Sequence, residues 1–444
     1  MAQSLTLAQA RALWWQKQAL AGTATGPLAR VLGDSGWLRT LGGTDVYIAA
    51  RARRPGMTRA ELDAAVAAGE LRVHPAVRGC IYLVPSSAVP DLLALNAEAW
   101  RAQTEKELAR IGKTFDVIEA IAPAVLAALT EPMTPDAIRK GFRGDIPSFG
   151  DAGKKVGLST PLPLALRLLE FAGKIERSLD GGKLDSERYL WRRTAGKLAA
   201  PARDHDQRVA NVVDAFLGFA GPATLAQLSA WSGRAQRDLK TAIGKLDAVS
   251  VEVEGLGEAY VRSADVKARP PEPRGIALVA FEDNYLINHG LAAVTDPRHH
   301  AIEVDIWGGG KGPEALGEAN HVLSRSIVID GLIAGFWEVD PRRAGAVWHT
   351  FDPAPRALAR ELDDRTAETA GFLIRELGHA KVFTLDTMGD VQARADRIVE
   401  LAGKSGGKSG GKSAAKPGGK SAAKPTKHAR TARAAAPKRA AGKR

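Results

Sequence analysis

Three stretches of the chain repeat one order of elements: an amphipathic helix, a short helix, a third helix, and two strands joined by a tight polar turn. The third stretch shows this order most clearly. Its first helix, Asp206 to Phe219, carries apolar residues at the i, i+3, i+4 spacing of a half-buried helix. After two further helices, apolar residues alternate over Val249 to Val253, and a turn at Gly255 to Gly257 leads into a return strand. This order of elements is that of a winged helix.

The third helix of that stretch, Arg234 to Leu246, is apolar on one face and basic elsewhere. A helix with an apolar back and a basic front suits docking in the major groove of duplex DNA. An ordinary solvated face is the alternative interpretation. The candidate DNA-binding residues of this helix are Arg234, Arg237, Lys240 and Lys245.

The second stretch begins near Phe115 and ends in a hairpin that we expect within Ile175 to Trp191. Its third helix, Pro161 to Ala172, is apolar almost all round. A helix of this kind is usually buried, so we expect it to pack between domains rather than to read bases. Two residues that precede it, Lys154 and Lys155, are candidate phosphate contacts.

The first stretch opens with a predicted helix over Leu7 to Ala19. Its third helix begins at Thr58, and Glu61 three residues later completes a capping box. A hairpin follows, with its turn expected at His74 and Pro75. Because arginines crowd this region while the helix itself is acidic, we expect phosphate positioning here rather than base reading. The candidate DNA-binding residues are Arg51, Arg53, Arg54, Arg59 and Arg78.

After Pro270 the pattern changes to strands, including a hairpin over Ser326 to Val339 with Asp330 and Gly331 as its two-residue turn. Helices are expected over Ala357 to Leu377 and Asp390 to Leu401. The predicted fold class is α+β. It comprises winged-helix domains at residues 1–112, 113–200 and 201–270, a small β-rich, barrel-like domain with closing helices at 271–403, and a disordered basic tail at 404–444.

The cationic excess of the protein lies in this tail. The whole chain has a formal net charge of +12, but residues 404–444 contain 13 Lys or Arg and no acid, so the body has 49 basic and 50 acidic residues. The tail resembles histone-like lysine-rich tails, and its composition favours disorder and binding to a polyanion through counterion release. A solubilising role and contact with acidic lipids are the alternatives. Its regularly spaced candidate DNA contacts are Lys404, Lys408, Lys412, Lys416, Lys420 and Lys424.

A single cysteine, Cys80, excludes an internal disulfide or a zinc finger built on cysteine pairs, and it indicates a reducing compartment. The N-terminal sequence does not resemble a secretory leader, and no run approaches the ~18 apolar residues of a membrane span. We therefore expect a cytoplasmic protein.

Two further patterns bear on metal or phosphate chemistry. His299 and His300 are adjacent, and neighbouring side chains on a strand point to opposite faces, so we predict no metal site and no cofactor. The glycine-rich Gly308 to Pro313 lacks the ending of a phosphate-binding loop. It is expected to be a hairpin tip, with Lys311 as a candidate DNA contact.

Five strings carry a family resemblance: LTLAQARAL from Leu5, RGCIYLVP from Arg78, GPATLAQLSAWSG from Gly221, LVAFEDNYL from Leu278 and VIDGLIAGFWEV from Val328. Together with the predicted domain order, they resemble the AlkZ/YcaQ-like DNA glycosylase family over nearly all of residues 1–400. The resemblance implies a monomer that holds duplex DNA in a basic channel and excises bulky alkylated or cross-linked purines.

The catalytic signature of that family is a Gln-x-Gln or Gln-x-Asp pair on a loop of the first winged domain. No glutamine lies between Gln18 and Gln103, and Leu38 and Thr40 stand near the expected positions. Asp45 is the candidate catalytic carboxylate that remains. A turn or capping aspartate is the alternative interpretation of this residue.

The sequence therefore leaves two main functions open. One is a DNA glycosylase, which hydrolyses an N-glycosylic bond, and the other is a non-catalytic architectural or regulatory protein that binds duplex DNA. An RNA-binding or ribosome-associated role is favoured by the tail alone, because major-groove helices do not fit A-form RNA. We expect double-stranded DNA as the partner, no membrane and no obligate protein partner, a monomer, and association with the nucleoid.

Deleting Lys404 to Arg444 is expected to lower the salt dependence of DNA binding by several units of slope, since each lost phosphate contact removes about 0.9. The measurement is the affinity for one duplex over a series of salt concentrations, for the full chain and for the deletion variant. An unchanged slope would show that the tail does not contact DNA.

Overall fold

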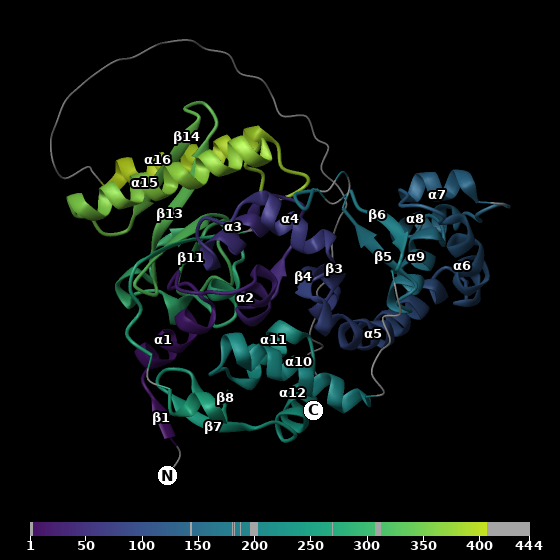
Figure 1. The fold of residues 1–444 in the computed structure, drawn as a ribbon, viewed down its shortest axis with the longest axis horizontal. Helices are drawn as coiled ribbons and strands as arrows, with labels where there is room; N and C mark the ends of the chain where they lie inside the picture. Colours follow the sequence, from purple (N-terminus) through teal and green to yellow (C-terminus); the bar gives the residue numbers. More distant parts are fainter. Residues whose placement is uncertain are drawn as a thin grey trace. The chain divides into compact units, whose positions relative to one another are not determined.

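The computed structural model describes residues 3–405, except residues 143, 180, 182, 187, 196–202, 269 and 307–311 (Figure 1). The described residues up to 404 belong to one compact unit. Most of the predicted tail and Lys311 therefore lie outside the described residues. Among the helices that are described, none combines the length and the apolar character needed to cross a bilayer.

The third stretch forms three helices followed by an antiparallel hairpin. They are α10 (His205–Ala220), α11 (Leu225–Ser232), α12 (Gln236–Ile243), β7 (Ala248–Val253) and β8 (Gly257–Arg262). The Thr224 side chain caps α11 in a capping box with Gln227, and Gly233 ends that helix in the left-handed conformation.

The N-terminal segment packs on this third stretch. Strand β1 (Gln3–Leu5) pairs in parallel with β7, which gives a three-stranded sheet of order β1-β7-β8. In helix α1 (Leu7–Lys17), Trp14 Nε1 donates a hydrogen bond to the carbonyl of Pro222 at 3.0 Å. The helix expected to open the first domain thus lies against α10, and the strand before it pairs with β7, both about 200 residues or more further along the chain.

The first stretch contains a three-stranded sheet of order β2-β4-β3 and three helices. These elements are α2 (Leu28–Asp34), β2 (Leu38–Arg39), α3 (Asp45–Arg53), α4 (Arg59–Ala67), β3 (Leu71–Pro75) and β4 (Ile81–Pro85). The expected turn at His74 and Pro75 is wrong, because both residues pair with β4 inside strand β3. The chain reverses instead at the short helix η1 (Val77–Gly79), where Arg78 and Gly79 both adopt positive φ angles.

The apolar third helix of the second stretch packs mainly against the first helix of the same stretch, so its position between domains stays a prediction. Its elements are α6 (Asp116–Ala128), α7 (Pro135–Gly141), α8 (Gly150–Lys155), α9 (Leu162–Phe171), β5 (Ile175–Ser178) and β6 (Leu190–Arg193). Helix α5 (Val89–Ala109) connects the first stretch to these elements. Glu170 of α9 is fully buried, pairs with Arg177 at 2.7 Å and lies 3.9 Å from His74 of the first stretch.

The C-terminal part is built on an open four-stranded sheet of order β14-β13-β12-β9. Its strands are β9 (Ile276–Val279), β12 (Arg325–Ile329), β13 (Leu332–Asp340) and β14 (Gly345–Thr350), and the helices α15 (Arg356–Phe372) and α16 (Met388–Ser405) follow (Figure 1). The expectation of a barrel is wrong for the described strands. The two faces of the sheet pack on different apolar clusters. Trp337 belongs to one cluster and Phe336, on the opposite face, belongs to the other, so the sheet lies between two cores and does not close into a barrel.

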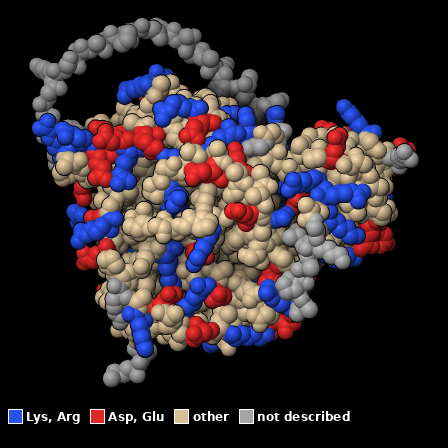
Figure 2. Space-filling model, viewed as in Figure 1, with Lys and Arg blue, Asp and Glu red and all other residues tan. Residues whose placement is uncertain are grey.

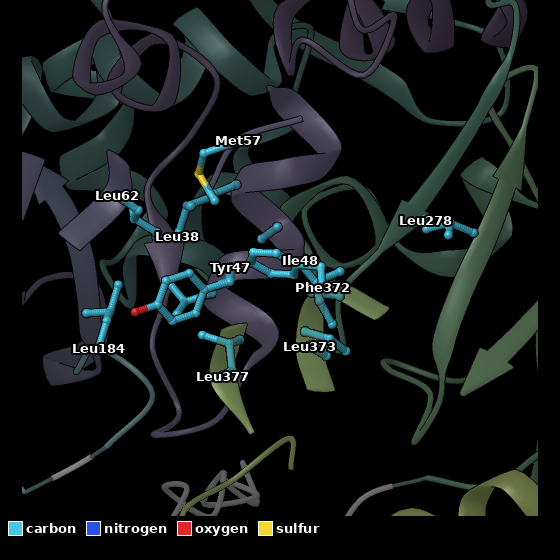
Figure 3. Close-up of a cluster of buried hydrophobic side chains, with 14 of the residues drawn as sticks. Leu38, Tyr47, Ile48, Met57, Leu62, Leu184, Leu278, Phe372, Leu373 and Leu377 are labelled. Carbon is cyan, nitrogen blue, oxygen red and sulfur yellow. The ribbon is translucent and has the colours of Figure 1, made fainter. Parts of the chain in front are cut away.

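One apolar cluster joins three of these regions (Figure 3). Tyr47 and Met57 come from the first stretch, Leu278 from the C-terminal sheet and Phe372 from α15. Leu184, between β5 and β6, completes the contact with the second stretch. The regions are therefore packed through a shared core rather than only joined end to end.

Two buried ion pairs fix α3 to the C-terminal sheet. Arg53, with no exposed surface, donates to both oxygens of Asp283 at 2.8 and 2.9 Å. Arg325 donates to Oδ1 of Asp45 from two nitrogens, at 2.9 and 2.6 Å. Because these charges lie out of water, removing one partner of a pair would leave the other charge buried without compensation.

Asp283→Asn is expected to lower the free energy of unfolding by about 3–5 kcal/mol, because it leaves the Arg53 cation buried and unpaired. The matched control is Asp34→Asn, which breaks the Arg30–Asp34 ion pair, whose side chains are 79% and 75% exposed. That loss should change the unfolding free energy by less than about 1 kcal/mol. Urea unfolding of both variants tests this, and equal effects would contradict it.

Candidate nucleic-acid interface

Arg39, Arg78 and Arg234, which we call the arginine row, lie on neighbouring segments of the first and third stretches. Arg39 in β2 lies opposite Tyr82 in β4. Arg78, in the turn that connects β3 to β4, is exposed. A Cβ atom on Gly233, at the end of α11, would lie 2.8 Å from Cγ of Arg78, so the Arg78 side chain passes directly over that glycine. Arg234 is the next residue.

The electrostatics of the row follow from its partial burial. Burial raises the pKa of the Tyr82 hydroxyl, while the cations of Arg39 and Arg78 beside it act in the opposite direction. Burial also lowers the pKa of Arg234, and the carboxylates of Glu98 and Asp238 only partly offset this. A partly buried arginine whose charge is only partly balanced by nearby carboxylates is stabilised by an anionic partner such as a phosphate.

Helix α12 continues the basic surface beyond Arg234. Leu239, Ala242 and Ile243 are buried and hold the helix to the core. On its outer side, Lys240 is exposed and the Arg237 side chain is 91% exposed and lies 3.4 Å from Asp238. Lys245, after the helix, pairs with Asp206 at 2.9 Å.

Most of the arginines predicted in the first stretch are occupied by other parts of the protein. Arg53 is buried against Asp283 and is unavailable to a phosphate. Arg51 pairs with Glu368 and stacks 4.2 Å from the Phe372 ring, and Arg59 pairs with Asp63 at 3.0 Å. Arg54 is half-buried. On the face in Figure 2, basic and acidic side chains are likewise interleaved.

The remaining candidate basic residues lie apart from the arginine row or outside the residues that the structure describes. Lys155 is exposed on α8, and Lys154 pairs with Asp151 at 3.0 Å. Lys404 falls in the last turn of α16. Lys311 and the tail residues Lys408, Lys412, Lys416, Lys420 and Lys424 lie outside the described residues.

Asp45, the carboxylate proposed from the sequence, is enclosed by structural contacts. Oδ1 accepts from Arg325, and Oδ2 accepts from the backbone N–H of Phe281 at 2.6 Å. Burial raises the pKa of Asp45, and the ion pair with Arg325 opposes this rise. With both oxygens engaged at the start of α3, the carboxylate is placed to join elements rather than to meet a substrate.

Two residues that sequence reasoning missed lie at the end of the arginine row. Arg39 forms an ion pair with Glu282, which follows β9, and the two side chains are 25% and 14% exposed. Leu38 and Thr40, on either side of Arg39, are buried. No period-2 alternation marks Arg39 in the sequence, because Trp37 and Leu38 before it are both apolar and Thr40 after it is polar. No sequence signal pointed to Glu282 as its partner.

The histidines of the C-terminal part do not gather around a common point. His289 is buried and stacked on Trp14 with ring centroids 3.7 Å apart, and burial lowers its pKa to about 3. His299 lies 3.3 Å from Asp352, and His300 lies 3.4 Å from the Thr295 carbonyl. Over the described part of the chain, no group of three or more His, Cys, Asp or Glu is arranged to hold a metal ion.

A family model and a solved structure both relate this chain to AlkZ-like DNA glycosylases. The family model described as DNA glycosylase AlkZ-like matches residues 28–372. The solved structure of Streptomyces sahachiroi DNA glycosylase AlkZ is similar to this chain with a TM-score of 0.62 at 20% sequence identity. The match covers 86% of this chain and 99% of that one, and at this identity it shows a shared fold. No curated protein sequence matches the chain.

Arg78→Ala and Arg234→Ala are each expected to reduce the magnitude of the slope of log affinity against log salt by about 0.9 for duplex DNA, because each arginine is predicted to contact one phosphate. Arg298→Ala is the control, since that exposed arginine is already paired with Asp296 and Asp352. Fluorescence anisotropy at several salt concentrations measures the slope. Equal slopes for all three variants would contradict the row as a DNA contact.

Proposed function

We propose that this chain, which belongs to the AlkZ-like DNA glycosylase family, binds duplex DNA along the arginine row and hydrolyses the bond between deoxyribose and a modified purine. The observation that carries the proposal is the course of the row. It runs from α11 to β2 and ends at Arg39, between the two positions where the family's catalytic pair is expected. Phosphate contacts would set the position of the duplex, and the chemistry would take place where the row ends.

In this proposal the three helix-and-hairpin stretches act as winged-helix domains. Helix α12 presents Arg237 and Lys240 to the duplex. The lysines of α8 and of the tail add phosphate contacts that do not depend on the DNA sequence. Excision requires that the base leaves the stack and enters a polar site. A protein engaged with DNA in this way would be found with the nucleoid.

A second candidate is a non-catalytic protein that holds duplex DNA on the same surface. One specific observation favours it: Leu38 and Thr40 are buried, and Asp45 is held by Arg325 and Phe281. None of the three is therefore free to position a water molecule. This candidate predicts tight, salt-sensitive binding that is the same for damaged and undamaged duplexes.

Base release separates the two candidates. The full chain is mixed in excess with a duplex that carries 7-methylguanine or a cross-linked purine, and released base is measured by mass spectrometry. We expect release well above spontaneous depurination, and none from the undamaged duplex. Binding of the damaged duplex without release would support the non-catalytic candidate instead.

A further inference from the structure

We propose that Glu282 is the carboxylate that activates the attacking water in base excision, and that Arg39 positions it. The inference rests on the proposed function and deepens it by naming the group that replaces the family's glutamine pair. Four features of Glu282 support this role: its backbone conformation, the contacts that hold its turn, its access to solvent, and a small cavity beside it.

Glu282 has an unusual backbone conformation. Its φ angle is +53°, and it is one of five described residues other than glycine with a positive φ. For an L-residue this conformation costs about 1–2 kcal/mol, and glutamate has none of the local hydrogen bonds that ease it for Asn or Asp. Arg78 of the arginine row is another of the five. Strained residues of this kind gather at functional sites, where the surrounding structure holds them in place.

The turn that carries Glu282 is clamped on both sides. The backbone N–H of Phe281 donates to Asp45, and Asp283 forms its two bonds to Arg53. Asn284 Nδ2 donates to the carbonyl of Trp37 at 2.8 Å. The residue before Glu282 and the two after it are therefore all bound to the segment that contains β2 and α3. This arrangement fixes the Glu282 side chain against Arg39.

Glu282 is the acid of this region that solvent can reach. The side chains of Asp283 and Glu338 are each 1% exposed and that of Asp45 is 7% exposed, and all three are held in buried ion pairs. The side chain of Glu282 is 14% exposed. A group that must exchange a proton with water and meet a sugar needs this access, so Glu282 is the carboxylate suited to the chemistry.

A small cavity adjoins the ion pair. It measures about 10 Å³ and is lined by Arg39, Glu282, Leu41 and Asp45, among others. A volume of this size is close to the least that one water molecule requires. Arg39 Nε is buried and has no hydrogen-bond partner among the described residues. A water molecule in the cavity would supply that partner and would lie beside the carboxylate.

The reaction then balances without a cofactor. The water oxygen forms a bond to C1′ of deoxyribose, the C1′–N bond breaks, and its electron pair moves to the departing purine. The Glu282 carboxylate accepts a proton from the water and stabilises the positive charge that develops on the sugar. The proton afterwards passes to solvent or to the purine, which leaves the carboxylate ready for another cycle.

Arg39 keeps its charge beside Glu282. Burial lowers the pKa of Arg39, but the Glu282 carboxylate and Tyr82 together raise it above its ordinary value. The guanidinium is therefore a permanent cation that holds the carboxylate in position. Arg39 is therefore a positioning residue: it holds the Glu282 carboxylate in place and helps to place the DNA phosphates.

The test is single-turnover base release by the full chain carrying Glu282→Gln, on the damaged duplex that the wild type processes. We expect the rate of release to fall by about 100-fold or more, the usual contribution of a general base. DNA affinity should be equal or higher, because the substitution removes a negative charge and frees Arg39 for a phosphate. Glu282→Asp should retain part of the rate. The control, Glu361→Gln, removes an acid paired with Arg365 on α15 and should release base as the wild type does.

The outcomes distinguish the two proposals. Release by Glu282→Gln at the wild-type rate would overturn the role of Glu282 and leave the proposed function standing. Absence of release by the wild type itself would overturn the proposed function, and this role with it. Equal losses of rate, affinity and urea stability in Glu282→Gln would assign Glu282 a structural role only, which also overturns the inference.

Discussion

The buried ion pair between Arg53 and Asp283 is the contact on which the candidate site depends. Both side chains are almost completely removed from water, and their two hydrogen bonds allow only one register between α3 and the turn after β9. A shift of either element would leave a charge buried and unpaired, which costs several kcal/mol. The positions of Phe281, Glu282 and Asn284 follow from this register, and with them the contact of Glu282 with Arg39. A buried pair that adds little net stability can still determine which surface residues meet.

The distribution of charge explains why only a small part of the body is free to bind a polyanion. The body has almost equal numbers of basic and acidic residues. Arg51, Arg53 and Arg59, which look like a phosphate-binding group in the sequence, are paired with acids from α4, the turn after β9 and the C-terminal helices. Arg78 and Arg234 of the arginine row differ because they lie at a turn and at a helix end, whereas Arg39 in β2 is paired with Glu282. A short row of arginines can set the position of a duplex on the protein. A cationic tail can raise the affinity for DNA without fixing where the duplex lies.

The sequence predicted the parts of the structure that depend on local patterns. The helices α10 to α12, the capping box of Thr58 and Glu61, and the Asp330-Gly331 turn were all visible, because periodicity and capping involve neighbours in the chain. The parallel pairing of β1 with β7 and the attachment of α1 to α10 were not predicted, because nothing local specifies a partner so far away. The same limit applies to the site. Arg78 and Arg234 were identified as cations, but Arg39 and Glu282 are 243 residues apart, and only the folded chain shows that they form a pair.

A carboxylate in place of a glutamine pair changes what the surrounding residues must provide. A glutamine can orient water but cannot accept its proton, whereas a carboxylate can do both. The carboxylate, however, is repelled by the phosphates of a duplex, and two like charges 4 Å apart cost about 4 kcal/mol at the effective dielectric of a protein surface. Arg39 offsets this repulsion because the ion pair has no net charge. Arg39 thus stands between the buried residues Leu38 and Thr40, and in the proposed site it makes an acid compatible with a surface that binds a polyanion.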